Sequence, residues 1–269
     1  MSAPPAKSPK RGRRPHGPVD SFQARAWFNS IAYVIGTSAP HAIEQNVQPH
    51  LIQQADGKAK SSSSWVKYKN GLRLPQDGYG KDGRPGAVMA AERHAPESVD
   101  VFRHPLWKAM RTDIMDIKET TDLIATFRPV IAQYYVDLSD AMVKRRVDSF
   151  EQSIGLSIWI DWDDFRSALD HLAAHLMILR TGIVRHLRPM RHECAHNIVK
   201  ALGPVAGSPW FGPFHEEMFD WLEANIWGDI FDEYYEEREY RRGKGWRKSK
   251  PDWLVSMRRV VYRRVVENR

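Results

Sequence analysis

The stretch DFRSALDHLAAHLMILRTGIVRH, residues 164–186, decides the fold class. Its large apolar side chains recur at alternating spacings of four and three residues, which places them on one side of an α-helix. They are Phe165, Leu169, Leu172, Leu176, Leu179 and Ile183. Because a helix buries such a stripe against other elements, we expect residues 164–186 to pack against a core or a partner helix.

Helical patterning continues on both sides of this stretch, so we expect a mostly α fold. The expected helices cover 22–35, 40–54, 61–70, 87–93, 106–125, 130–150, 189–202, 214–240 and 253–266. Gly203 and Pro204 are expected to close the helix over 189–202. Residues 55–60 and 75–86 are predicted to be polar, turn-rich loops, and 154–159 a short strand or a link.

This patterning divides the chain into four parts. Residues 1–19 combine five prolines with five basic residues, so we expect a disordered basic tail. Residues 20–104 are predicted to form a small helical module and residues 105–240 a helical bundle. Residues 241–269 are predicted to be a basic C-terminal helix and tail.

Composition narrows the class of protein further. The 269 residues are 42% hydrophobic and 27% charged, as in a soluble globular protein. No apolar run is long enough for a membrane span, and the N-terminus lacks the apolar core of a secretory signal. Cys194 is the single cysteine, so an internal disulfide framework is excluded and a reducing, cytoplasmic location is expected.

The net charge of +7 is concentrated at the two ends of the chain. Residues 241–269 hold eleven Lys and Arg against two acids, and residues 1–17 hold no acid. Basic ends of this kind bind phosphate backbones or acidic partners, or keep a protein soluble. The candidate nucleic-acid contacts in the C-terminal part are Arg241, Arg242, Lys244, Trp246, Arg247, Lys248, Arg258 and Arg259.

A second basic segment, SSSSWVKYKNGLRLP at residues 61–75, resembles the recognition helix and exit of Cro/repressor-type helix-turn-helix domains. Small polar residues begin the segment, a glycine ends it and a proline follows. Trp65 or Val66 would anchor the helix, and Lys67, Lys69 and Arg73 would reach the DNA backbone. The alternative is a short surface helix with a packing role.

The segment RHECAH at residues 191–196 contains the pattern H-E-x-x-H. In zinc peptidases of this pattern, His192 and His196 would bind the metal and Glu193 would act as the base. The third ligand would be Glu216 or Glu223, which follow His196 by 20 and 27 residues. The peptidase hypothesis predicts zinc as a cofactor.

The same segment contains R-x4-H, formed by Arg191 and His196, and resembles the HEPN ribonucleases of prokaryotic toxins, antitoxin systems and phage defence. The resemblance implies an all-α bundle that cleaves RNA without a metal at a homodimer interface. His196 would be the general acid/base, Arg191 would stabilise charge on the phosphate, and His192 would fill the variable polar position. Glu193 has no family role and could hold His192 or Arg191 in place.

Two further hypotheses about this segment and about the protein stay open. Arg191 and His192 could form a structural ion-pair cluster with the acidic helix, and the protein could be a non-catalytic nucleic-acid-binding or scaffold subunit of a nucleoprotein complex. His171 and His175 are also four residues apart, as in half a metal site, but they flank the apolar stripe, so we expect partly buried boundary positions. No membrane partner is expected.

Overall fold

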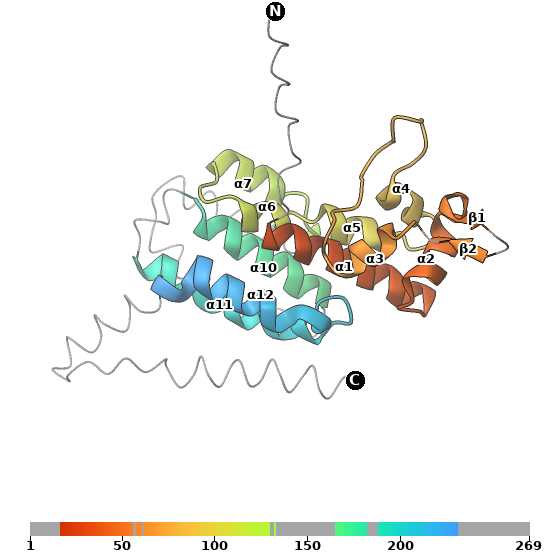
Figure 1. Ribbon diagram of the computed structural model, residues 1–269. Coiled ribbons are helices and arrows are strands. Elements are labelled where there is room, and N and C mark those ends of the chain that lie inside the picture. The colour runs from red at the N-terminus through yellow and green to blue at the C-terminus, as the bar shows by residue number, and fades with distance from the viewer. Residues whose placement is uncertain are drawn as a thin grey trace, which may run out of the picture.

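The computed structural model describes residues 17–55, 58–60, 62–129, 132, 165–181 and 188–230. It confirms the mostly α fold class (Figure 1). The tails at 1–16 and 241–269 and the predicted elements at 154–159 and 253–266 lie outside the described residues, as does almost all of the predicted helix at 130–150. No helix in the described part of the chain is long and apolar enough to cross a bilayer.

The main core forms around the predicted amphipathic helix, which the structure describes as α10 (Phe165–Leu179). Its stripe residues Leu169, Leu172 and Leu176 are buried, and α10 packs along α11 (Arg188–Gly207) (Figure 1). The predicted end of α11 at Gly203 and Pro204 is wrong, because the helix continues through both residues. Val205 and Ala206 are buried in the same stretch, and their packing offsets the hydrogen bond that proline removes.

The N-terminal part is a second, smaller packing unit. It contains α1 (Pro18–Ile35), α2 (Pro40–Val47), α3 (Ser64–Lys69), α4 (Ala87–Glu92) and α5 (Glu97–Arg103). The prediction of one helix over 40–54 followed by a loop is wrong. After α2 come a 3-10 turn (Pro49–Leu51) and an antiparallel hairpin of β1 (Gln53–Ala55) and β2 (Lys58–Lys60). Pro49 disfavours a helical conformation at Gln48, which ends α2.

The predicted helix over 106–125 is also divided. It forms α6 (Leu106–Arg111) and α7 (Ile117–Ile124), with a bend between them. Asp116 is the N-cap of α7, and its carboxylate accepts hydrogen bonds from the backbone N–H groups of Lys118 and Glu119. A strong N-cap inside an apolar periodic stretch therefore starts a new helix instead of continuing the old one.

Helix α1 contributes to both apolar cores. Val19, Phe22 and Ala26 belong to the α10–α11 core, whereas Trp27, Phe28 and Ile31 belong to the core of the N-terminal part. The predicted division into domains near residue 104 stays a prediction. What the structure describes is one long helix whose two ends serve two neighbouring apolar clusters.

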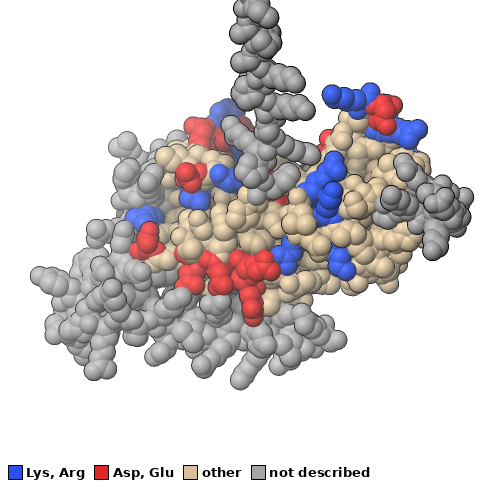
Figure 2. Space-filling view, viewed as in Figure 1, with Lys and Arg blue, Asp and Glu red and all other residues tan. Residues whose placement is uncertain are grey.

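The last described segment is acidic. A 3-10 turn (Gly212–Phe214) leads into α12 (His215–Leu222) and a π-helical turn (Glu223–Trp227). Arg25 of α1 joins α12 through an ion pair with Glu217, and its guanidinium lies 4.7 Å from the centre of the Phe214 ring. On the face shown in Figure 2, the largest group of Asp and Glu lies on the α12 side, and smaller groups of both charge signs lie elsewhere.

Candidate functional site

The predicted recognition segment forms α3, a six-residue helix anchored by aromatic rings. Trp65 and Tyr68 are buried, and Trp65 stacks on Trp27 of α1 with the ring centroids 5.4 Å apart. Trp65 is therefore the anchor, whereas Val66 is exposed. Lys67, on the opposite side of the helix from the aromatic pair, is exposed as well. The anchoring fixes which side of α3 faces solvent.

The C-terminus of α3 is locked by Gly71. Its φ of +67° lies in the left-handed region, and its N–H donates to the carbonyl of Tyr68. The N–H of Leu72 donates to the carbonyl of Lys67 at 2.8 Å, which completes a Schellman cap. A Cβ on residue 71 would lie 2.0 Å from the hydroxyl of Ser21, so glycine is required by the backbone conformation and by the approach of α1.

The three predicted basic contacts are placed differently. Lys67 is exposed, and Lys69 is exposed but its ammonium donates to the carbonyl of Ser38 at 2.9 Å. Arg73 is half-buried just beyond the cap. The tight turn of a Cro-type domain is not found here, because the 3-10 turn and the β1–β2 hairpin separate α2 from α3.

The R-H-E-C-A-H segment lies in the first two turns of α11. Arg191, His192, Glu193 and His196 are half-buried. His192 and His196 share one side of the helix, with ring centroids 6.4 Å apart. In a regular helix, residues five positions apart differ by about 140° around the axis, so Arg191 is turned away from His196.

Burial sets the ionisation of this segment. Burial, with Lys200 and His192 nearby, lowers the pKa of His196 to about 4, so its imidazole is neutral at pH 7. Cys194 lies on the inner side of the same turn, where burial raises the pKa of its thiol. A neutral imidazole can accept a proton, whereas a buried protonated thiol is a poor nucleophile.

The predicted zinc site is not assembled among the residues that the structure describes. Within them, no group of three or more His, Cys, Asp or Glu side chains is placed to hold a metal ion. Glu216 is exposed on α12, and Glu223 begins the π-helical turn after it. The pair His192 and His196 therefore has no third protein ligand in this part of the chain.

The other histidine pair differs from its prediction. His171 and His175 are fully buried in α10 and do not lie at the boundary of the stripe. Burial is the largest effect on both, and it lowers the pKa of His171 to about 3 and that of His175 to about 4. The Nδ1–H of His175 donates to the carbonyl of His171 at 2.9 Å. A neutral imidazole that donates to its own helix, as His175 does, can occupy a core.

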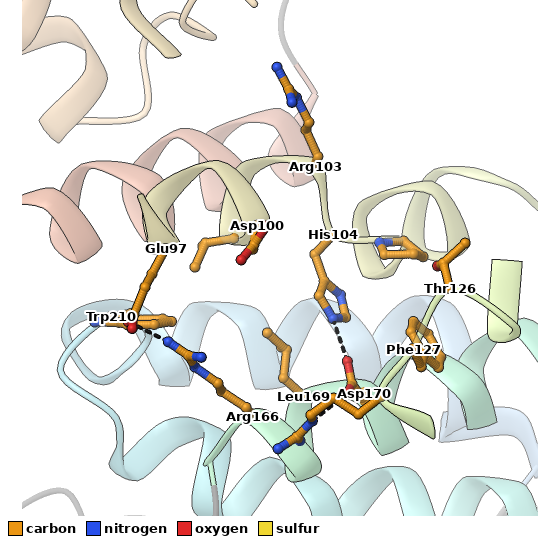
Figure 3. A pocket seen from close by; sticks show the side chains of 13 residues that line it. Glu97, Asp100, Arg103, His104, Thr126, Phe127, Arg166, Leu169, Asp170 and Trp210 are labelled. Carbon is orange, nitrogen blue, oxygen red and sulfur yellow. Dashed lines mark hydrogen bonds and ion pairs between the residues drawn. The ribbon is translucent and has the colours of Figure 1, made fainter. Parts of the chain in front are cut away.

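The structure also contains a pocket that no pattern in the sequence predicts (Figure 3). At one end, His104 donates from Nε2 to the carboxylate of Asp170 at 3.0 Å. The proton is assigned to Nε2 because Nδ1 accepts the backbone N–H of Leu106. Arg128 donates to the other oxygen of Asp170 at 3.1 Å, and Phe127 stacks on His104.

This hydrogen-bond network joins three segments that are distant in sequence. Both ring nitrogens of His104 and both oxygens of Asp170 have partners, so the network holds both side chains in place. His104 follows α5, Arg128 follows α7 and Asp170 lies on α10. No local motif joins the three residues, which is why spacing rules could not find them.

The Lys, Arg and Trp side chains predicted to contact nucleic acid from residues 241–259 lie outside the described residues. Compared with protein-family models, with curated proteins and with solved structures, the chain shows no significant match.

Proposed function

We propose that the protein binds nucleic acid through the outer side of α3 and the basic chain around it. The observation that carries this proposal is the exposure of the lysines of α3, a helix whose aromatic side is buried against α1. Trp65 and Tyr68 are buried against α1, whereas Lys67 and Lys69 are both exposed, on flanks of the helix that differ by about 160°. Because packing holds the backbone of α3, only the lysine side chains lose conformational entropy when they meet a phosphate backbone.

The surrounding sequence supports the same surface. Residues 57–73 contain five Lys and Arg and no Asp or Glu. Asp56 directly precedes this stretch. Two other nearby carboxylates have partners, since Glu44 is buried and accepts a hydrogen bond from Ser62, and Asp77 pairs with Arg103. The exposed acids Glu216, Glu217 and Asp220 on α12 would repel a polyanion, which favours approach from the α3 side.

A salt titration tests this proposal. Binding of a fluorescent DNA duplex and of a single-stranded RNA should weaken linearly in log K against log salt. Lys67→Ala should lower affinity and reduce the slope by about one unit, because one phosphate contact is lost. Lys118→Ala is the matched control, since Lys118 is exposed on α7 and pairs with Asp122. Equal slopes for both variants would remove α3 from the interface.

We propose, as a second function, metal-independent ribonuclease activity at Arg191 and His196. The observation in its favour is the position of His196, which is half-buried near the start of α11 with a neutral imidazole at pH 7 that can accept a proton. Because Arg191 is turned about 140° from His196 on one helix, a second copy of the chain would have to supply the opposing group. The HEPN resemblance implies such a homodimer.

RNA cleavage in the presence of EDTA tests this second function. His196→Ala and Arg191→Ala should each abolish cleavage, whereas the exposed His94→Ala should retain it. RNA binding without cleavage in the parent protein would leave the non-catalytic binding or scaffold role. Cleavage or peptidase activity that EDTA removes and zinc restores would instead support the metal-dependent alternative.

A further inference from the structure

The pocket at the junction of the two packing units is a site of its own. Its volume is about 380 Å³, within the range of small-molecule sites. Helix α5 and the turn after it form one wall, residues 126–128 a second, the start of α10 the floor, and Trp210 closes one end (Figure 3). The pocket is separate from both α3 and the Arg191–His196 segment.

The two ends of the pocket differ in how firmly their charges are held. At one end, Asp170 is buried and fixed by His104 and Arg128. At the other end, Arg166 of α10 pairs with Glu97 of α5, and both side chains are about half exposed. Ion pairs this accessible contribute little to stability, so an anionic ligand can replace Glu97 on the Arg166 guanidinium.

The space between the two ends suits a planar, partly apolar group. Leu169 lies on the floor between Arg166 and Asp170, and the Trp210 ring lies beside Glu97 (Figure 3). Asp100, one turn after Glu97 on α5, is exposed and lines the same space. A ligand here would find apolar surface for a ring, a carboxylate that accepts N–H groups, and a guanidinium that binds an anion.

We propose that this pocket binds a nucleoside monophosphate, with the phosphate on Arg166 and the amino groups of the base toward Asp100. Phosphate matches the planar donor geometry of a guanidinium better than a single carboxylate oxygen does. The ring lies along Leu169 and Trp210. Because the site is independent of α3, its failure would leave the proposed nucleic-acid binding untouched.

Calorimetric titration of the full chain with adenosine monophosphate tests the proposal. Saturable binding is expected, with adenosine and inorganic phosphate each binding at least tenfold more weakly, because each offers only part of the contacts. Arg166→Gln should weaken binding about tenfold or more. Arg84→Gln is the matched control, since Arg84 is an exposed arginine that also faces a carboxylate, Asp82.

Glu97→Gln separates a ligand site from a structural ion pair. Removal of the competing carboxylate should raise the affinity for adenosine monophosphate. If the ion pair is purely structural, Glu97→Gln and Arg166→Gln should instead lower that affinity by the same factor. A 5′-phosphorylated tetranucleotide distinguishes a strand end from a free nucleotide as the source of the ligand. Absence of saturation at millimolar adenosine monophosphate, or equal effects of Arg166→Gln and Arg84→Gln, would overturn the proposal.

Discussion

Two pairs of histidines with the same spacing lie on two helices that pack together, and their surroundings differ. His171 and His175 on α10, like His192 and His196 on α11, have ring centroids 6.4 Å apart. The α10 pair is fully buried, whereas the α11 pair is half-buried. The i,i+4 spacing fixes how far apart the rings lie, but the packing of the helix face decides what the imidazoles can do.

The largest expected difference between the two histidine pairs is in the free energy of unfolding that each contributes. His175→Ala should lower the free energy of unfolding by about 3 kcal/mol, because it leaves a cavity and removes a buried hydrogen bond. His196→Ala should cost less than about 1 kcal/mol, since its ring is partly solvated. Urea denaturation of both variants measures the difference. Equal costs would mean that the two pairs have equivalent surroundings.

The next effect is the pH dependence of stability. The pKa of His175 is about 4 in the folded protein and about 6.5 when unfolded, so the unfolded state binds more protons below pH 6.5. Its contribution is complete above pH 6.5, falls by roughly 2 kcal/mol by pH 5, and is lost through pH 4. Urea denaturation at pH 7.5 and 5.0 should therefore show a smaller pH effect in His175→Gln than in the parent. An unchanged pH effect would contradict the assignment of a neutral, buried imidazole.

The smallest expected difference is in the free energy of unfolding for substitutions on the two sides of α11. Cys194 is buried, so Cys194→Ala should lower the free energy of unfolding by about 1 kcal/mol. Glu193→Ala, on the adjacent half-exposed side, should stay within about 0.5 kcal/mol. Thermal or urea unfolding measures the free-energy change for both variants. Slow labelling of the Cys194 thiol in the folded protein is an independent check of its burial. A larger cost for Glu193→Ala would place that carboxylate in a structural network.

Local periodicity predicted the parts of the fold that depend on one helix at a time. Leu169, Leu172 and Leu176 of α10 are buried as their spacing indicates, and Gly71 ends α3 as a left-handed cap. Interruptions were harder to predict. A carboxylate N-cap at Asp116 and a proline at residue 49 end or start helices inside stretches whose apolar pattern continues.

Long-range contacts explain what could not be predicted. The pocket joins His104, Arg128 and Asp170, whose separations in sequence carry no period of a helix or strand. The burial of His171 and His175 also differs from the prediction, because a polar side chain beside an apolar stripe is expected to keep contact with solvent. In the structure their pKa values are lowered and the His175 ring is bonded to its own helix.

The shared position of α1 has a consequence for how the protein unfolds. Its first turns fill the α10–α11 core with Val19, Phe22 and Ala26, and its later turns fill the other core with Trp27 and Ile31. Melting of either core would release one half of a continuous helix and weaken the other half. We therefore expect a single cooperative transition, and a fragment that starts at residue 105 would expose the apolar groove that α1 fills and aggregate.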